Sequence, residues 1–202
     1  MFSLHIEKCF GTSFGSALMD AYGSRFRLLY RCGSCGKYQI CTDYDYEVLE
    51  CDHHVSFEEV LEEYSGTDAV IHGHVFKEEL KLVPIGAYVV TWLREPAARL
   101  LSHYYHDKKT VKDLQMEDFF MANRNYITER IGAGFLWRVD FVGIMEKMDS
   151  HISIFEKLKG VTLNLERHNE GDYEVNEEEL KLAAEYVTAD QKIYERHSRL
   201  RK

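Results

Sequence analysis

Two short segments of the sequence carry residues that can bind an anion, and both follow the same plan. The first is SLHIEKCFGTSF at residues 3–14, and the second is TWLREPAARLLSHYY at residues 91–105. Each has apolar residues typical of a strand, then a polar turn, then a pattern typical of a helix. In open α/β sheets such turns gather at the carboxyl ends of the strands, where helix N-termini bind anions. Two such turns predict a ligand with phosphate at two places.

The first turn offers a cation, a flexible backbone and hydroxyl groups. Lys8 follows the strand directly, and Gly11, Thr12 and Ser13 open the helix. Glycine lets the backbone approach an anion closely, and the start of the helix offers free N–H groups. The order differs from the nucleotide P-loop, in which the Lys follows the last Gly. An alternative stays open, in which Thr12 or Ser13 is an ordinary helix cap and Lys8 is solvated.

The second turn offers a guanidinium and a hydroxyl. Arg94 ends the strand, and Ser102 lies two turns into the following helix. The planar fork of an arginine suits a phosphate group, to which the serine would add a second donor. The alternative is a surface ion pair of Glu95 with Arg94 or Arg99, which would contribute little to stability.

The elements that position these turns alternate between strands and helices, which predicts a central parallel sheet in a three-layer α/β domain. Strands are expected over residues 2–6, 26–30, 68–71, 87–93, 141–145 and 161–165, with 87–93 in a central position. Helices are expected over residues 12–22, 56–64, 114–121, 126–131, 150–158, 176–187 and 189–200, and one begins at Pro96. On that helix Arg99, Ser102, His103 and His106 are expected to form one polar stripe.

Composition limits the classes of function. The 202 residues are 45% apolar and 29% charged and contain no linker-like stretch, so one domain over residues 1–202 is expected. The net charge of −9 argues against nucleic acid or an anionic membrane as partner. No apolar run is long enough to span a membrane, and no secretory leader is apparent, so a cytoplasmic location is expected. The odd count of five cysteines fits a reducing compartment.

A cysteine-rich segment suggests a metal site as an alternative. Cys32 and Cys35 form a C-x-x-C motif, and Cys41, Cys51, His53 and His54 follow, with Cys51 and His53 in a C-x-H arrangement. Together these two motifs could supply four zinc ligands. The second half lacks the usual zinc-site spacing, so the favoured interpretation is an irregular loop over residues 32–54 on the acceptor side of the site.

Taken together, the two turns and their order resemble the sulfotransferase superfamily. The family's first motif, typically His-Ile-Pro-Lys-Thr-Gly-Gly-Thr-Ser, is matched by residues 5–13. The second, of the type Arg-Asp-Pro-x-x-Arg-x-x-Ser-x-Tyr, is matched by residues 94–104. Residues 72–74, 140–146 and 190–194 also look like the branch that contains the Golgi hexuronic-acid sulfotransferases and small bacterial relatives.

The resemblance implies a P-loop-like fold and the donor 3′-phosphoadenosine 5′-phosphosulfate (PAPS), with PAP as product. Lys8 and the backbone of Gly11, Thr12 and Ser13 would hold the 5′-phosphosulfate, and Arg94 and Ser102 the 3′-phosphate. Lys8 would also stabilise the leaving phosphate. A His with a pKa near neutrality suits the role of general base for the acceptor hydroxyl. His74 is the first choice and His72 the second. The acceptor would be a carbohydrate or small metabolite, and no metal is needed.

The first motif departs from the family pattern at three positions. Glu7 replaces proline, which brings a negative charge next to a dianion site, and Cys9 and Phe10 replace Thr and Gly. A bulky Phe10 where glycine lets the loop curl would weaken donor binding. Two other functions therefore stay open: a non-catalytic nucleotide-binding or interaction protein on the same fold, and a P-loop-type kinase.

Overall fold

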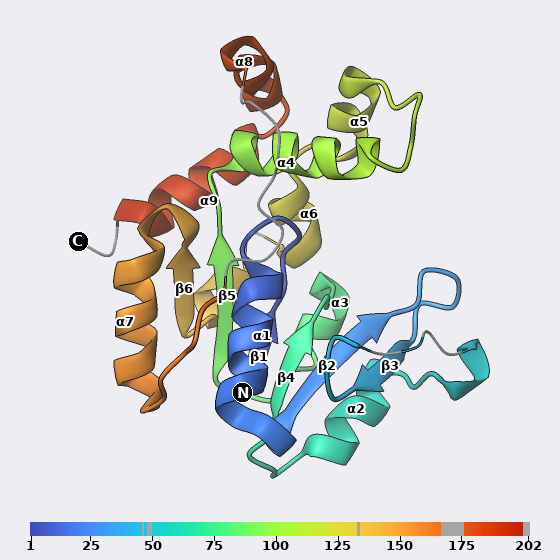
Figure 1. The fold of residues 1–202 in the computed structure, drawn as a ribbon, viewed down its shortest axis with the longest axis vertical. Coiled ribbons are helices and arrows are strands. Elements are labelled where there is room, and N and C mark those ends of the chain that lie inside the picture. The colour runs from blue at the N-terminus through green and yellow to red at the C-terminus, as the bar shows by residue number, and fades with distance from the viewer. Residues whose placement is uncertain (46, 48–49, 133, 167–175, 200–202) are drawn as a thin grey trace.

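The computed structural model describes residues 1–45, 47, 50–132, 134–166 and 176–199 (Figure 1). In this part of the chain one sheet has the strand order β3-β2-β4-β1-β5-β6. The strands are β1 Phe2–Leu4, β2 Phe26–Arg31, β3 Tyr38–Cys41, β4 Val70–Gly73, β5 Val89–Leu93 and β6 Phe141–Ile144. All neighbouring strands pair in parallel except β3, which is antiparallel to β2. The predicted α/β fold is confirmed, with one antiparallel edge strand added.

Several helices begin or end at local signals in the sequence. They are α1 Gly11–Tyr22, α2 Phe57–Tyr64, α3 Lys77–Leu80, α4 Pro96–Lys108, α5 Met116–Ala122, α6 Tyr126–Ile131, α7 Met148–Lys159, α8 Glu177–Glu185 and α9 Thr188–Arg199. Ser56 and Glu59 form the expected capping box before α2. Gly160 ends α7 in the left-handed conformation. None of the helices in the described ranges combines the length and the apolar character that crossing a membrane requires.

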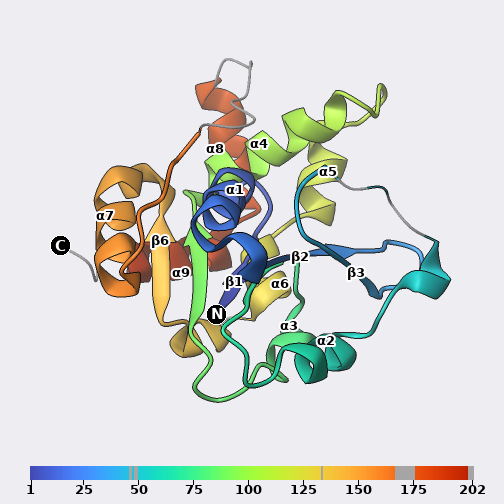
Figure 2. The same ribbon diagram turned by 60° about the horizontal axis from the view of Figure 1, so that its bottom comes forward.

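Helices cover both faces of the sheet, which makes three layers (Figures 1 and 2). On one face, α1 and α7 pack their apolar side chains onto a core that includes Phe14, Trp92 and Phe155. On the other face, α2, α3, α6 and α9 cover a core that includes Leu80, Leu93 and Ile127. The strands are short and buried, as expected for a parallel sheet that is covered twice.

A third group of helices lies beyond the carboxyl ends of the strands. Helix α4 follows β5 and crosses above the sheet, where it packs with α5 and α8 (Figure 1). Leu100, Leu101 and Tyr104 of α4 are buried in this contact, as the sequence predicts. This helical group covers the edge of the sheet at which both predicted anion-binding turns lie, after β1 and β5.

Two expectations about the elements are wrong. Residues 161–166 form no strand, because Val161 and Leu163 reach the core from an extended segment that is not paired in the sheet. The backbone N–H of Leu163 donates to the Glu156 carboxylate (2.8 Å). The segment 32–54, expected to be irregular, contains β3. Both segments are apolar because their side chains are buried. Only β3 follows a neighbouring strand through a short turn, which lets its backbone pair with β2.

Candidate active site

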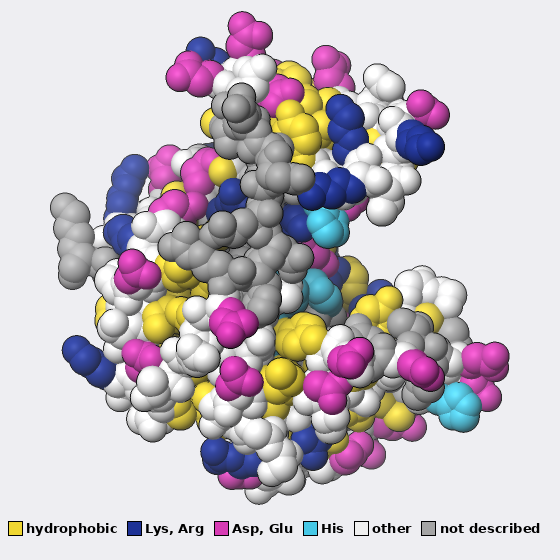
Figure 3. Space-filling model, in the orientation of Figure 1, with side chains coloured by type: hydrophobic (Ala, Val, Ile, Leu, Met, Phe, Trp, Pro, Cys, Tyr) yellow, Lys and Arg dark blue, Asp and Glu magenta, His cyan; other side chains and the backbone are white. Residues whose placement is uncertain are grey.

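A pocket of about 380 Å³ lies at the point where the strand order of the sheet changes side, next to β1. Strands β2 and β4 lie on one side of β1, and β5 and β6 on the other, so the loops after β1 and β5 diverge and leave a crevice. The pocket is lined by His5, Glu7, Lys8, Phe10, Gly11, Thr12, Ser13, His74, Arg94, Ser102, His103, His106, Asp107 and Met145. Figure 3 shows this side of the molecule hollowed beneath α4, with Lys, Arg and His side chains gathered there.

The loop between β1 and α1 has the backbone shape of an anion site. Lys8 (φ 65°) and Phe10 (φ 70°) are left-handed, whereas Cys9 between them is not. Alternating handedness turns successive N–H groups towards one side and makes a concave binding surface. Helix α1 then begins at Gly11 without any hydrogen bond from a capping side chain. The alternative in which Thr12 or Ser13 caps this helix is therefore wrong, and both residues lie in the first turn, which lines the pocket.

Cys9 and Phe10, which differ from the family motif, are accommodated in the left-handed loop. Cys9 is buried in the core, and burial raises the pKa of its thiol to about 12. The ring of Phe10 packs edge-on against Trp92, with ring centroids 5.0 Å apart. A left-handed non-glycine residue costs about 1–2 kcal/mol, which this contact offsets in part. Phe10 thus adopts the left-handed conformation that glycine usually supplies, and the expectation that its bulk weakens donor binding stays a prediction.

Gly11 is required by a close approach of another part of the site. A Cβ atom at this position would lie 1.7 Å from the ring of His5. The first turn of α1 therefore packs directly on an imidazole, and no larger residue fits between them.

Two cations from different strands meet in the pocket. Lys8 follows β1, and Arg94 follows β5. Burial lowers the pKa of Lys8, Asp107 opposes this change, and the positive charges of Arg94 and Lys109 lower the pKa further. Because Lys8 and Arg94 line the same pocket, an anion bound there would interact favourably with both charges.

The N-terminus of helix α4 is capped by the residue that precedes it, Glu95. The Glu95 carboxylate accepts hydrogen bonds from the N–H groups of Ala97 (3.3 Å) and Ala98 (2.7 Å). Glu95 therefore caps the helix, in contrast to the alternative in which it pairs with an arginine, and Pro96 is the first helical residue. Arg94 is left to line the pocket together with Ser102.

The expected polar stripe on α4 is wrong at Arg99. This side chain is fully buried, and its guanidinium lies 4.5 Å from the centre of the Tyr126 ring. Its nitrogens have no hydrogen-bond partner among the described residues. Helix α6 covers this face of α4, and the aromatic ring supplies the contact that solvent would otherwise provide. Ser102, His103 and His106 do share the face that borders the pocket.

Three histidine rings stack beside the turn. His5 lies between His74 (centroids 4.1 Å apart) and His72 (5.3 Å). His72 is buried outside the pocket lining, with Nδ1 2.8 Å from the Ser3 hydroxyl, and burial lowers its pKa to about 3. His74 lines the pocket. Of the two histidines that the sequence singled out, only His74 can reach a bound molecule.

The Nδ1 atom of His74 has two acceptors. It lies 2.9 Å from the backbone oxygen of His5 and 3.1 Å from the Glu7 carboxylate. A backbone oxygen can only accept, so Nδ1 carries a proton, and whenever the ring is neutral its lone pair lies on Nε2. This is the tautomer that a general base needs.

Glu7 itself is held by residues from α6. Its Oε1 lies 3.1 Å from Nη2 of Arg130. Burial alone would raise the pKa of Glu7, but the hydrogen bond and charge of His74, together with Arg130 and Tyr126, lower it well below its usual range. The negative charge of Glu7, which lines the pocket, is therefore compensated by Arg130 and by its contact with His74.

Comparison with known proteins identifies the family of this chain. A family model described as the sulfotransferase family matches residues 1–199. The chain belongs to the sulfotransferase family. No curated protein sequence matches it at a significant level.

Solved structures show the shared fold of this sulfotransferase. A sulfotransferase from Alicyclobacillus acidocaldarius aligns with a TM-score of 0.52 at 13% identity, over 96% of this chain and 93% of that one. Mouse sulfotransferase SULT7A1 complexed with PAP aligns with a TM-score of 0.46 at 11% identity, over 95% of this chain and 64% of that one. At this level of identity the first likeness shows the P-loop-like α/β fold and nothing finer.

Of the residues that the sequence singled out for this sulfotransferase, the pocket brings together all but one. Lys8, Gly11, Thr12, Ser13, His74, Arg94 and Ser102 line it, and His72 does not. Sequence reasoning missed Arg130 and Tyr126 and regarded Glu7 only as a departure. Tyr126 and Arg130 are four residues apart on one helix, a spacing that places both on one face. Nothing in the sequence indicates that this face meets the first turn.

Proposed function

We propose that this protein transfers a sulfuryl group from PAPS to a hydroxyl group of a carbohydrate or small metabolite. The observation that supports this most is the meeting of Lys8 and the left-handed turn with Arg94 and Ser102 in one pocket. These residues occupy the matching positions of two family motifs that lie far apart in the sequence. A pocket lined by two such turns suits a ligand with two separate phosphate groups.

The donor would lie between the two turns. The N–H groups of the loop and of the first turn of α1, with Lys8, would hold the 5′-phosphosulfate. Arg94 and Ser102 would hold the 3′-phosphate. The partly desolvated Lys8 and the fixed N–H groups suit a reaction in which charge builds on the leaving phosphate, because they need little reorganisation.

The acceptor hydroxyl would be activated by His74. As the new S–O bond forms, the bond from sulfur to the leaving phosphate oxygen breaks, and Nε2 of His74 takes the hydroxyl proton. The Glu7 carboxylate would orient the ring through Nδ1 and stabilise the imidazolium that forms. Arg130 would keep Glu7 in place. Positioning and electrostatics thus dominate, as in phosphoryl transfer.

Calorimetric titration of PAP, alongside ATP with Mg²⁺, tests the donor site. We expect PAP to bind and ATP not to bind. Arg94→Ala should weaken PAP binding about 10–100-fold, since it removes a charge-assisted hydrogen bond. Lys8→Ala should weaken it similarly. Arg124→Ala is the matched control, because its exposed guanidinium lies outside the pocket lining.

Other results would favour the remaining functions. Binding of ATP with Mg²⁺ but not of PAP would indicate a kinase. Absence of binding by either nucleotide would favour the non-catalytic interaction protein. With PAP binding established, transfer of labelled sulfuryl groups to a panel of sugars and small hydroxyl compounds identifies the acceptor.

A further inference from the structure

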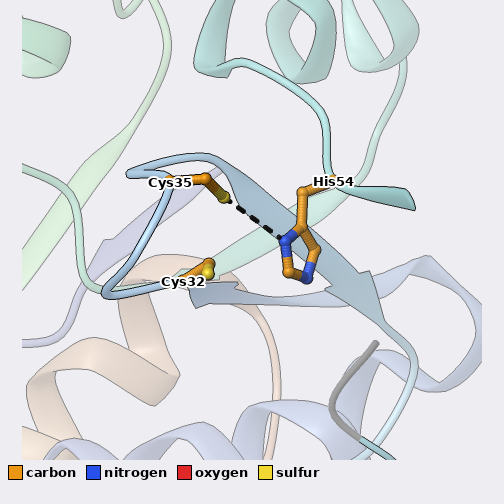
Figure 4. Close-up of side chains that lie close together, drawn as sticks. All are labelled: Cys32, Cys35 and His54. Atoms are coloured by element: carbon orange, nitrogen blue, oxygen red, sulfur yellow. Dashed lines mark hydrogen bonds between the residues drawn. The ribbon is translucent and has the colours of Figure 1, made fainter. Parts of the chain in front are cut away.

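The turn between β2 and β3 presents two thiols on one side. Cys32 directly follows the last residue of β2, and its N–H donates to the backbone oxygen of Lys37 (2.9 Å). The N–H of Gly36 donates to the backbone oxygen of Cys32 (3.0 Å), with Gly36 left-handed at φ 70°. The tight turn brings Cys32 and Cys35 next to each other (Figure 4). Such a turn is the usual backbone for a C-x-x-C pair whose two thiolates bind one metal ion.

An isolated bridge brings a histidine to these thiols. Tyr38 of β3 and Val55 exchange two backbone hydrogen bonds, each 2.8 Å long. This pairing fixes the neighbouring His54, which is buried (4% exposed) and points towards the turn. Its Nδ1 lies 3.6 Å from Sγ of Cys35 (Figure 4). Its Nε2 is buried without a hydrogen-bond partner among the described residues, so Nδ1 is the nitrogen through which the ring interacts.

The ligand atoms of the three side chains are close enough to share one metal ion, and the 3.6 Å from Cys35 Sγ to His54 Nδ1 matches an edge of a zinc tetrahedron. The ligand atoms of Cys32, Cys35 and His54 all lie within 4.8 Å of one another. With zinc bonds of ordinary length, a tetrahedron has S–N edges of about 3.6 Å and S–S edges of about 3.8 Å. Two thiolates and a neutral imidazole would balance the charge of the ion and satisfy its preference for sulfur and nitrogen.

We propose that Cys32, Cys35 and His54 bind a zinc ion that fixes the β2–β3 turn to the segment before α2. The expected ligand set changes at one position, because the His53 side chain is 64% exposed and His54 takes its place. The side chain of Cys51 lies outside the described part of the chain. A water molecule or a further side chain completes the coordination.

The metal would support one wall of the candidate active site. β2 runs parallel to β4, so the turn after β2 lies at the same edge of the sheet as His74 after β4. Tyr38 pairs with Val55 beside the cluster. Its hydroxyl lies 3.2 Å from the backbone oxygen of His74 and 2.5 Å from the Glu79 carboxylate, so it contacts the backbone of His74 while donating chiefly to Glu79. Zinc would thus fix β3, whose Tyr38 contacts the backbone of His74. This consequence rests on the proposed function, whereas zinc binding does not.

Elemental analysis of the full chain, purified under reducing conditions, tests the site. We expect about one zinc per chain in the wild type. Cobalt added to the chelated protein should give the visible absorption of a tetrahedral thiolate complex. Cys35→Ser and His54→Ala should each lower the zinc content at least about tenfold. His53→Ala and Cys41→Ala are matched controls that should retain the metal, because neither residue belongs to the cluster.

Several outcomes would overturn the assignment. Wild-type protein that takes up neither zinc nor cobalt has only a thiol–imidazole hydrogen bond here. Full zinc content in Cys35→Ser would show that the metal binds elsewhere. A Cys32–Cys35 disulfide in the reduced preparation would also exclude the site. If a variant fails to fold, the cobalt titration of the wild type still decides, because it needs no substitution. A protein that binds zinc but not PAP would keep the metal site and lose the proposed function.

Discussion

At the scale of single residues, Glu7 is the most informative departure from the family motif. A carboxylate beside a dianion site is unfavourable when it faces the ligand. Here the carboxylate is turned to Nδ1 of His74 and Nη2 of Arg130, both 3.1 Å away. The negative charge therefore acts on the candidate base, and the pair resembles the base and orienting acid of a catalytic triad.

Replacing Glu7 with glutamine should lower kcat by about 10–100-fold while leaving PAP affinity nearly unchanged. The loss stays below that of a full triad, because the backbone oxygen of His5 still holds the His74 tautomer. Steady-state kinetics and PAP titration measure the two quantities separately. Glu129→Gln is the control, since this exposed carboxylate pairs with Lys77 instead. Equal activity of Glu7→Gln and wild type would remove Glu7 from the mechanism.

Gly11→Ala should weaken PAP binding at least about tenfold and destabilise the fold by about 1–3 kcal/mol. The added methyl group would meet the His5 ring at 1.7 Å and push apart the turn and the histidine stack. Calorimetry and urea unfolding measure both effects. Gly134→Ala is the control, because a Cβ atom there meets nothing within 4 Å. Wild-type PAP affinity in Gly11→Ala would contradict the close packing of His5 on this turn.

At the scale of elements, the short helix α6 depends on a residue from α9. Asp190 is fully buried, and its carboxylate accepts from the N–H groups of Ile127 (2.9 Å) and Thr128 (2.8 Å) and from the Thr128 hydroxyl (2.6 Å). It thereby supplies the N-terminal cap that α6 lacks within its own segment. Since α6 carries Tyr126 and Arg130, this cap also fixes the partners of Glu7.

Asp190→Ala should lower the free energy of unfolding by about 3 kcal/mol, because it leaves buried donors without an acceptor. It should also reduce kcat through the loss of Arg130 placement, with a smaller effect on PAP affinity. Chemical denaturation and kinetics measure these changes. Asp113→Ala, at an exposed position, should stay within about 0.5 kcal/mol of wild type. A stability change as small as that of the control would contradict the capping role.

The elements were predictable where local signals set them and unpredictable where pairing decided. The break at Pro96, the capping box at Ser56 and the glycine at position 160 place three helix ends correctly. The apolar stretch 161–165 has the pattern of a strand but is not paired in the sheet, because it packs against the core beside α7. Periodicity reports which side chains are buried, and it does not report whether a backbone finds a partner strand.

At the scale of the whole molecule, several buried histidines make stability depend on pH. Burial lowers the pKa of His72 to about 3 and, with the charge of Arg99, that of His103 to about 4. Burial also lowers the pKa of His5 well below its usual value. The unfolded chain therefore takes up these protons first as the pH falls. Stability should be complete above pH 6.5 and decline towards pH 4.

The free energy of unfolding should fall by at least about 1.4 kcal/mol per pH unit across this range, which corresponds to one extra proton in the unfolded state. Urea unfolding at a series of pH values measures the slope. His72→Gln should reduce the slope by about one proton. His53→Ala, which alters an exposed histidine, should leave it unchanged. A flat profile between pH 6.5 and 4.5 would show that these rings are not held neutral in the folded protein.

The candidate site was predictable only as far as each turn contains its own chemistry. Lys8, Gly11 and Arg94 were found because residue type and local order suffice to indicate an anion site. The link from Glu7 to Arg130 joins segments far apart in the sequence, and only the packing of α6 beneath the first turn creates it. His54 was passed over for His53 for the same reason, since the Tyr38–Val55 bridge decides which of the two faces the thiols.

The dependence of α6 on Asp190 has a consequence for the order of events on the ribosome. The strands and the first turn are complete long before residue 190 leaves the exit tunnel, yet Glu7 gains its partners only once α9 has docked on α6. A nascent chain can therefore form its sheet while His74 still lacks a fixed carboxylate. The carboxylate that orients the candidate base would therefore be fixed only after α9 has emerged and docked on α6.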